Sequence, residues 1–240
     1  MTQVYGKITK LESPIDVMYL MHKVYMIHTD RTEILAEKLQ HGGDLNEVKA
    51  NVDAWLKHLL YHADTEDTYM TGPLIANLHA HRSRPAKKNE IEHEDLRIIG
   101  GEIADFIEQD DNAVLANDVA SRFILKEKEE HTELARKAED VEYALLQTLG
   151  DTKTIARNRR HLHQKIMELR GQEFDHFENE EAFVLPLVKE YMTSEQELEC
   201  SRKLLFDDES ENPRWIIDFI YSELEPHEKE LLQQLEDSFS

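Results

Sequence analysis

Two short segments of the chain each carry a histidine and a glutamate four residues apart: His62 with Glu66, and His176 with Glu180. On an α-helix, this spacing places both side chains on one face. Each pair also falls where a stripe of apolar residues would otherwise continue, so both pairs are expected to face the protein interior. A buried carboxylate is costly unless it is paired or bound to a metal. The two pairs are therefore candidate halves of one metal site.

The spacing alone is weak evidence, and a simple alternative is a buried His–Glu hydrogen bond within each pair. With 13 histidines and 50 acidic residues among 240, about three such pairs are expected by chance, and two occur. The positions of the pairs are more informative, because residues at equal distances from a hairpin turn lie at the same height. His22 and His62 are each 20 residues from position 42. His131 and His176 lie 20 residues before and 25 residues after position 151, a mismatch of roughly 7 Å, or about one helical turn.

Composition indicates a helical protein, because charged residues make up 32% of the chain while Gly (8) and Pro (6) are scarce. The net charge of −22 disfavours nucleic acid and anionic membranes as partners. The single cysteine, Cys200, cannot form an intramolecular disulfide and suits a reducing compartment. There is no early apolar run typical of a signal peptide and no apolar stretch of about 18 residues that could span a bilayer. We therefore expect a soluble, cytoplasmic protein.

Apolar periodicity predicts an all-α fold: an up-and-down four-helix bundle with one inserted helix and a C-terminal helical extension. Residues 1–192 are expected to form the bundle, and residues 193–240 an extension that packs on the bundle or on a second subunit. Residues 72–88 are expected to form a basic loop after Gly72-Pro73. The helices are predicted over residues 14–40, 45–70, 89–109, 113–149, 152–191, 195–206 and 213–237, the last interrupted by Pro226.

The order of the motifs resembles that of the hemerythrin-like, or HHE cation-binding, family over roughly residues 14–192. The resemblance is carried by Leu20-Met21-His22-Lys23, His62-x-x-x-Glu66-Asp67, Glu129-Glu130-His131 and His176-x-x-x-Glu180-Glu181, the last followed by Val184-Leu185-Pro186. It implies a four-helix bundle that holds two iron ions, with manganese or zinc as alternative metals. The terminal ligands that it implies are His22, His62, His131 and His176, and the bridging carboxylates are Glu66 and Glu180.

The chain departs from this family's oxygen carriers. Those proteins have a second histidine one turn after the third-helix histidine, where this chain has Ala135. Their last helix carries His-x-x-x-x-Asp, where this chain has His-x-x-x-Glu. In addition, the inserted helix carries His93 within Ile91-Glu92-His93-Glu94, which also resembles the third-helix motif. His93, His131 or both could fill that role; the spacing to His176 favours His131, with His93 as a fifth histidine. His28 similarly competes with His22.

A missing second histidine would leave a metal open to water, peroxide or substrate, which favours reactive chemistry or sensing over reversible oxygen carriage. The resemblance thus implies a non-haem di-iron protein that binds or reacts with O₂, peroxide or NO, either as a sensor or as a di-iron oxidoreductase. Glu127 and Glu173 are candidates for orienting the ligand imidazoles. The alternative is a metal-free helical interaction module that uses its acidic surface, or the apolar residues around Trp215, to bind a partner or form a homodimer.

Overall fold

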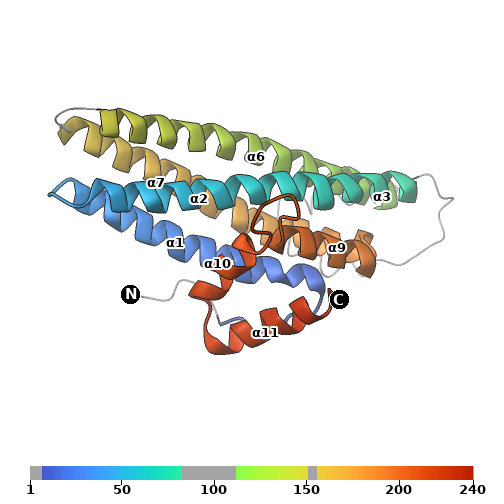
Figure 1. The fold of residues 1–240 in the computed structure, drawn as a ribbon. Helices are drawn as coiled ribbons and strands as arrows, with labels where there is room; N and C mark the ends of the chain where they lie inside the picture. The colour runs from blue at the N-terminus through green and yellow to red at the C-terminus, as the bar shows by residue number, and fades with distance from the viewer. Residues whose placement is uncertain (1–6, 83–111, 151–155, 240) are drawn as a thin grey trace.

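The computed structural model describes residues 7–82, 112–150 and 156–239, and the regular structure in these ranges is helical throughout. Long helices pack against one another as a bundle (Figure 1), so the predicted all-α class is confirmed. The predicted inserted helix and His93 lie outside the described residues. Among the described helices, none is long and apolar enough to cross a membrane.

Four long helices form the bundle: α1 (Val17–Leu39), α2 (Leu45–Glu66), α6 (Asn112–Gly150) and α7 (Ala156–Asn179). Helix α1 packs against α2 and α7, and α6 packs against α2 and α7. A single 3₁₀ turn, η1 (Pro14–Asp16), precedes α1, so helical structure begins at residue 14, where the first helix was predicted to start with a proline. Gly42 adopts a φ of 103° in the turn between α1 and α2, a conformation that glycine reaches without steric cost. The Asp44 side chain then caps α2 by accepting a hydrogen bond from the Asn46 amide.

Two of these helices continue through a π-helical segment into a further helix. Helix α2 passes through η2 (Asp67–Thr71) into α3 (Gly72–Arg82), and α7 passes through η3 (Glu180–Val184) into α8 (Leu185–Tyr191). The predicted loop at residues 72–88 is therefore wrong for residues 72–82.

The physical reason lies in the prolines that follow each π segment by two residues, Pro73 and Pro186. A proline inside an α-helix lacks the amide hydrogen and crowds the carbonyl four residues earlier. In a π segment, hydrogen bonds reach five residues back, as from the Gly72 amide to the Asp67 carbonyl, and the widened turn gives the proline ring room. The Thr71 hydroxyl also donates to the Glu66 carbonyl at 3.1 Å. The helix therefore passes the proline instead of ending there.

Two apolar cores fill the bundle, one towards the α1–α2 and α6–α7 turns and one towards the other end. Along α2, the first core ends at Leu59 and the second begins at Met70. Along α6 the order is reversed: the second core ends at Ile124 and the first core begins at Leu134. His62, Glu66, His131 and His176 lie in the layer between the two cores, and His22 and Glu180 lie at its edge, flanked by residues of the second core.

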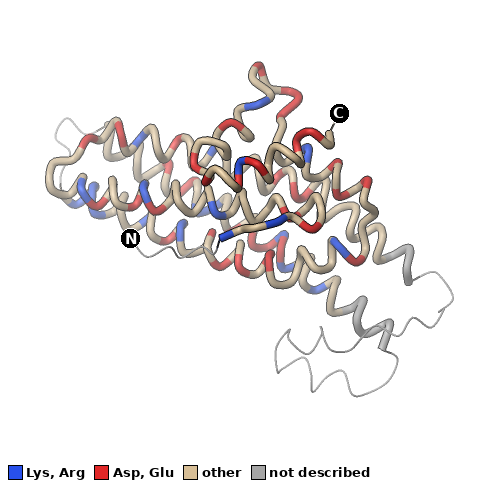
Figure 2. The backbone as a smooth tube through the Cα atoms, turned by 90° about the horizontal axis from the view of Figure 1, so that it is seen from below, with Lys and Arg blue, Asp and Glu red and all other residues tan. Residues whose placement is uncertain are grey.

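Three C-terminal helices, α9 (Ser194–Leu205), α10 (Trp215–Glu223) and α11 (Pro226–Asp237), lie against the bundle (Figure 1). Their apolar residues, such as Leu204 and Ile220, belong to the same core as Val24 of α1. A buried ion pair between Lys23 Nζ and Glu228 Oε1, at 2.6 Å, joins α1 to α11. The division into a bundle and an extension at residue 192 remains a prediction. Acidic residues are spread along the described part of the backbone and interspersed with basic ones (Figure 2).

Candidate metal centre

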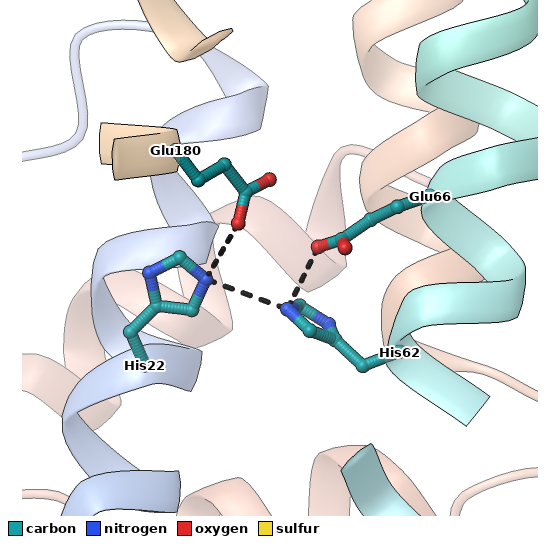
Figure 3. Close-up of side chains that lie close together, drawn as sticks. All are labelled: His22, His62, Glu66 and Glu180. Atoms are coloured by element: carbon teal, nitrogen blue, oxygen red, sulfur yellow. Dashed lines mark hydrogen bonds and ion pairs between the residues drawn. The ribbon is translucent and has the colours of Figure 1, made fainter. Parts of the chain in front are cut away.

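The first group of possible ligands combines His22 of α1, His62 and Glu66 of α2, and Glu180 of η3 (Figure 3). Nε2 of His62 lies 2.7 Å from Glu66 Oε1, and Nε2 of His22 lies 3.2 Å from Glu180 Oε2. The two Nε2 atoms are 3.4 Å apart. All four side chains are buried, and one potential ligand atom from each lies within 4.8 Å of the others.

The second group combines Glu66 of α2 with Glu127 and His131 of α6 and with His176 of α7. Nε2 of His131 lies 3.1 Å from Glu66 Oε2 and 3.3 Å from Glu127 Oε1. Glu66 therefore contacts His62 of the first group through Oε1 and His131 of the second through Oε2. A carboxylate that presents its two oxygens to two adjacent groups has the arrangement of a bridging ligand. The two buried clusters, which share Glu66, could form a dinuclear metal site.

Seven buried atoms of these groups make no hydrogen bond to any described residue: both carboxylate oxygens of Glu66 and of Glu180, Oε1 of Glu127, Nε2 of His131 and Nδ1 of His62. Buried polar atoms in proteins are normally hydrogen-bonded, so each exception requires an explanation. The short His–Glu contacts of this layer become ion pairs when the imidazoles are protonated, so the simple alternative also fits it. The same converging imidazole nitrogens and carboxylate oxygens could instead hold a cation.

Three further carboxylates hold the other ring nitrogen of three of these histidines. Nδ1 of His22 lies 2.8 Å from Glu181 Oε1, and Nδ1 of His131 lies 3.1 Å from Asp67 Oδ1. Nδ1 of His176 lies 3.3 Å from Glu130 Oε2. An acceptor at Nδ1 fixes the proton there and leaves Nε2 as the free donor of an electron pair, which is how metal-bound histidines are usually oriented.

The protonation of the site has a clear physical cause. Burial lowers the pKa of His22, but Glu180 and Glu181 outweigh it and raise that pKa to about 10. Burial raises the pKa of Glu66, but His62 and His131 outweigh it, so that pKa lies well below its ordinary value. Protons on the imidazoles thus balance the buried carboxylates without a metal. A metal ion that binds here would replace protons, since it needs deprotonated ligands.

The two helix hairpins supply equivalent residues. His22, His62, Glu66 and Asp67 of the α1–α2 side correspond to His131, His176, Glu180 and Glu181 of the α6–α7 side. The first histidine of each set contacts the glutamate of the other set: His22 contacts Glu180, and His131 contacts Glu66. Glu127 breaks the correspondence, because the residue four positions before His22 is the buried apolar Met18.

The structure brings together six of the seven residues proposed from the sequence: His22, His62, Glu66, His131, His176 and Glu180. The seventh, His93, is not among the described residues. Glu66 belongs to both groups, whereas Glu180 belongs to the first. That these residues bind metal remains a prediction. The competitor His28 lies outside both groups, with its Nε2 2.9 Å from the Asn51 carbonyl oxygen.

Sequence reasoning underestimated Glu127, which it treated as a residue that orients an imidazole. Glu127 lies one turn before His131 and supplies a carboxylate to the second group, so the absence of a histidine at Ala135 does not leave that group one donor short. The signal was present, because Glu127 and His131 have the same four-residue spacing as the two initial pairs, in the opposite order. Glu173 is not in either group; it accepts a hydrogen bond from Trp55 Nε1 at 2.9 Å.

Comparisons with protein-family models, with curated proteins and with solved structures find no match.

Proposed function

We propose that the protein is a hemerythrin-like, non-haem di-iron protein that binds or reacts with O₂, peroxide or NO. The observation that carries this proposal is the pair of buried four-residue groups that share Glu66. Carboxylates and imidazoles that project from several helices into a bundle are an established way to hold two iron or manganese ions. Two iron ions held here would supply redox chemistry towards a small oxygen- or nitrogen-containing ligand.

The chain's own residues have separable roles in this proposal. His22, His62 and Glu180 would hold one ion, Glu127, His131 and His176 the other, and Glu66 both. Asp67, Glu130 and Glu181 orient the imidazoles through Nδ1. The two apolar cores on either side of the layer exclude bulk water from it.

The types of ligand favour iron or manganese over zinc. Both groups offer nitrogen and oxygen atoms, and Cys200 belongs to neither, whereas structural zinc sites are usually compact and often rich in sulfur. Histidine and carboxylate sets with unfilled positions are typical of non-haem iron proteins that handle oxygen. Four protein residues in each group leave a six-coordinate ion able to accept a small ligand.

The alternative, a metal-free interaction module, gains no support from the apolar residues near Trp215. Ile216, Ile217 and Ile220 are fully buried within the chain, and the Phe219 ring stacks on His58 with centroids 3.9 Å apart. These residues therefore do not form an exposed apolar face on α10.

The test is to load the metal-free protein anaerobically with ferrous iron, to measure bound iron by elemental analysis, and then to admit air. About two irons per chain and a near-ultraviolet absorption band of the oxo-bridged type are expected. The double variant Glu66→Ala/Glu180→Ala should lose both signals. A matched control, Asp53→Ala/Glu178→Ala, removes two exposed acids from α2 and α7 and should retain them. Iron content that is the same in all three proteins would contradict the proposal.

A further inference from the structure

A cavity of about 430 Å³ opens between α2 and α6 and reaches the candidate metal centre. Its lining includes Asp64 and Asp67 of the α2 side and His131, Ala135 and Glu139 of α6. Asp64 and Glu139 are exposed, whereas His131 is only 5% exposed. The cavity therefore connects solvent with a buried residue of the second group.

The charges that line this cavity favour a cation. Asp64, Asp67 and Glu139 carry carboxylates, and the basic residue among the lining is Arg136. The guanidinium of Arg136 is already paired, at 2.7 Å with Glu133 and at 3.4 Å with Asp140. The remaining lining is mostly apolar and includes the small side chains of Ala63 and Ala135. Clefts lined by one sign of charge raise the local concentration of the opposite ion.

A continuous series of short contacts runs from the cavity to the shared carboxylate. The side chain of Asp67 is 39% exposed, and its Oδ1 lies 3.1 Å from His131 Nδ1. On the other side of the same ring, Nε2 has no hydrogen bond to a described residue and lies 3.1 Å from Glu66 Oε2. An ion that reaches Asp67 is thus one imidazole ring away from Glu66.

The equivalent cavity on the other side of the molecule has different chemistry. It measures about 350 Å³, lies beside α1 and α7, and reaches the pair of His22 and Glu181. Its lining includes Lys7, Lys23 and three aromatic rings, together with Glu178 and Glu181. Lys23 is paired with Glu228 at 2.6 Å, so Lys7 is the lysine that offsets the two carboxylates of this lining. The three carboxylates between α2 and α6 make that route the more negative of the two.

We propose that the cavity between α2 and α6 is the route by which divalent first-row transition-metal ions enter the buried centre. Asp64 and Glu139 attract the ion at the mouth, and Asp67 passes it to the layer of His131 and Glu66. This inference rests on the proposed metal centre, but it concerns the rate of loading rather than the final occupancy.

The experiment measures Co²⁺ uptake by metal-free protein in a stopped-flow spectrometer, followed by elemental analysis at equilibrium. The double variant Asp64→Asn/Glu139→Gln should load about tenfold more slowly than the wild type and with a weaker dependence on ionic strength. Its final metal content should be unchanged, because neither residue belongs to the two groups. A second variant, Ala135→Leu, narrows the cavity without changing charge and should also slow loading. The matched control Glu178→Gln, in the other cavity, should load at the wild-type rate.

Three outcomes would overturn the inference. Wild-type loading rates in both cavity variants would show that ions enter elsewhere, as would an equal slowing in Glu178→Gln. A lower final metal content in Asp64→Asn/Glu139→Gln would show that these residues hold the metal rather than admit it. Failure of the wild type to take up metal would instead overturn the proposed centre itself, so the two failures are distinguishable.

Discussion

Replacement of Glu127 by Gln should stabilise the metal-free protein and reduce its metal content. The variant therefore separates the two effects of this buried carboxylate. In the metal-free protein, burial raises the pKa of Glu127 from 4.5 to about 7, and the carboxylates of Glu180 and Glu66 add to the shift. The unfolded chain releases this proton more easily than the folded protein. The metal-free wild type therefore loses stability as the pH rises from about 4.5 through about 7, whereas glutamine does not titrate.

The size of this effect follows from the shift in pKa. Because Glu127 is only 2% exposed, solvent screens the shift little. At about 1.4 kcal/mol per unit, the variant should be more stable than the metal-free wild type by about 3 kcal/mol at pH 8 and by about 1 kcal/mol at pH 5. In Glu127→Gln, the second group keeps three of its four residues, so the metal content of the variant should fall from about two ions per chain to about one. An ion at a concentration a hundredfold above its dissociation constant stabilises by about 2.7 kcal/mol, so loading should largely remove the advantage of the variant.

The assay is urea unfolding at the two pH values, with chelator and with excess iron, together with elemental analysis. Glu129→Gln removes an exposed glutamate from the same helix and should behave as the wild type. The reasoning would be refuted by two ions in Glu127→Gln, or by metal-free Glu127→Gln that is no more stable than the wild type at pH 8. Either result would mean that Glu127 does not share the buried charged layer.

Three more predictions concern the site and its surroundings. Glu66→Gln should reduce the metal content to near none, because Glu66 alone belongs to both groups among the described residues; elemental analysis that found an ion retained would contradict the sharing. Chelation should lower the melting temperature of the metal-loaded wild type by about 10–20 °C. Two bound ions stabilise the fold by about 5 kcal/mol, and each kcal/mol corresponds to about 2–4 °C at this chain length. The melting temperature of the variant Glu66→Ala/Glu180→Ala should not respond to the chelator. Burial lowers the pKa of His58 from 6.5 to about 3, so the stability provided by its neutral form is present above about pH 6.5 and is lost as the pH falls towards 3. At pH 5 this loss should reach about 2 kcal/mol and disappear in His58→Gln but not in the exposed-site control His161→Gln, as measured by urea unfolding; equal acid sensitivity in all three proteins would refute it.

Six residues of the two groups could be identified from the sequence, because they are marked by short spacings or by equal distances from a turn. A four-residue spacing fixes which side chains share a helix face, and equal distances from a turn fix which residues share a height. The cap at Asp44 and the turn at Gly42 depend on equally local sequence. These features required no knowledge of how the helices rotate about their axes.

Other features depend on packing that the sequence does not display. Gly72-Pro73 was predicted to end the helix because proline usually does so. The sequence pattern does not indicate the π segment that allows the helix to continue. The role of Glu127 depends on the rotation of α6, which directs it towards Glu66 and Glu180. The carboxylates of Asp67 and Glu181 directly follow Glu66 and Glu180 in sequence, but their contacts are with histidines from the opposite hairpin.

The two π segments also limit how the length of this chain can change during evolution. Deletion of one residue within Asp67–Thr71 would restore an ordinary α-helical turn, in which the ring of Pro73 crowds the carbonyl four residues earlier. The helix would then kink or end at the proline, and Leu74 and Leu78, which follow it, would lose their packing in the core. The same holds for Pro186 and the buried Val188 beyond Glu180–Val184. Related sequences should therefore vary in length at the turn around Gly42, while the interval from each central glutamate to its following proline stays constant.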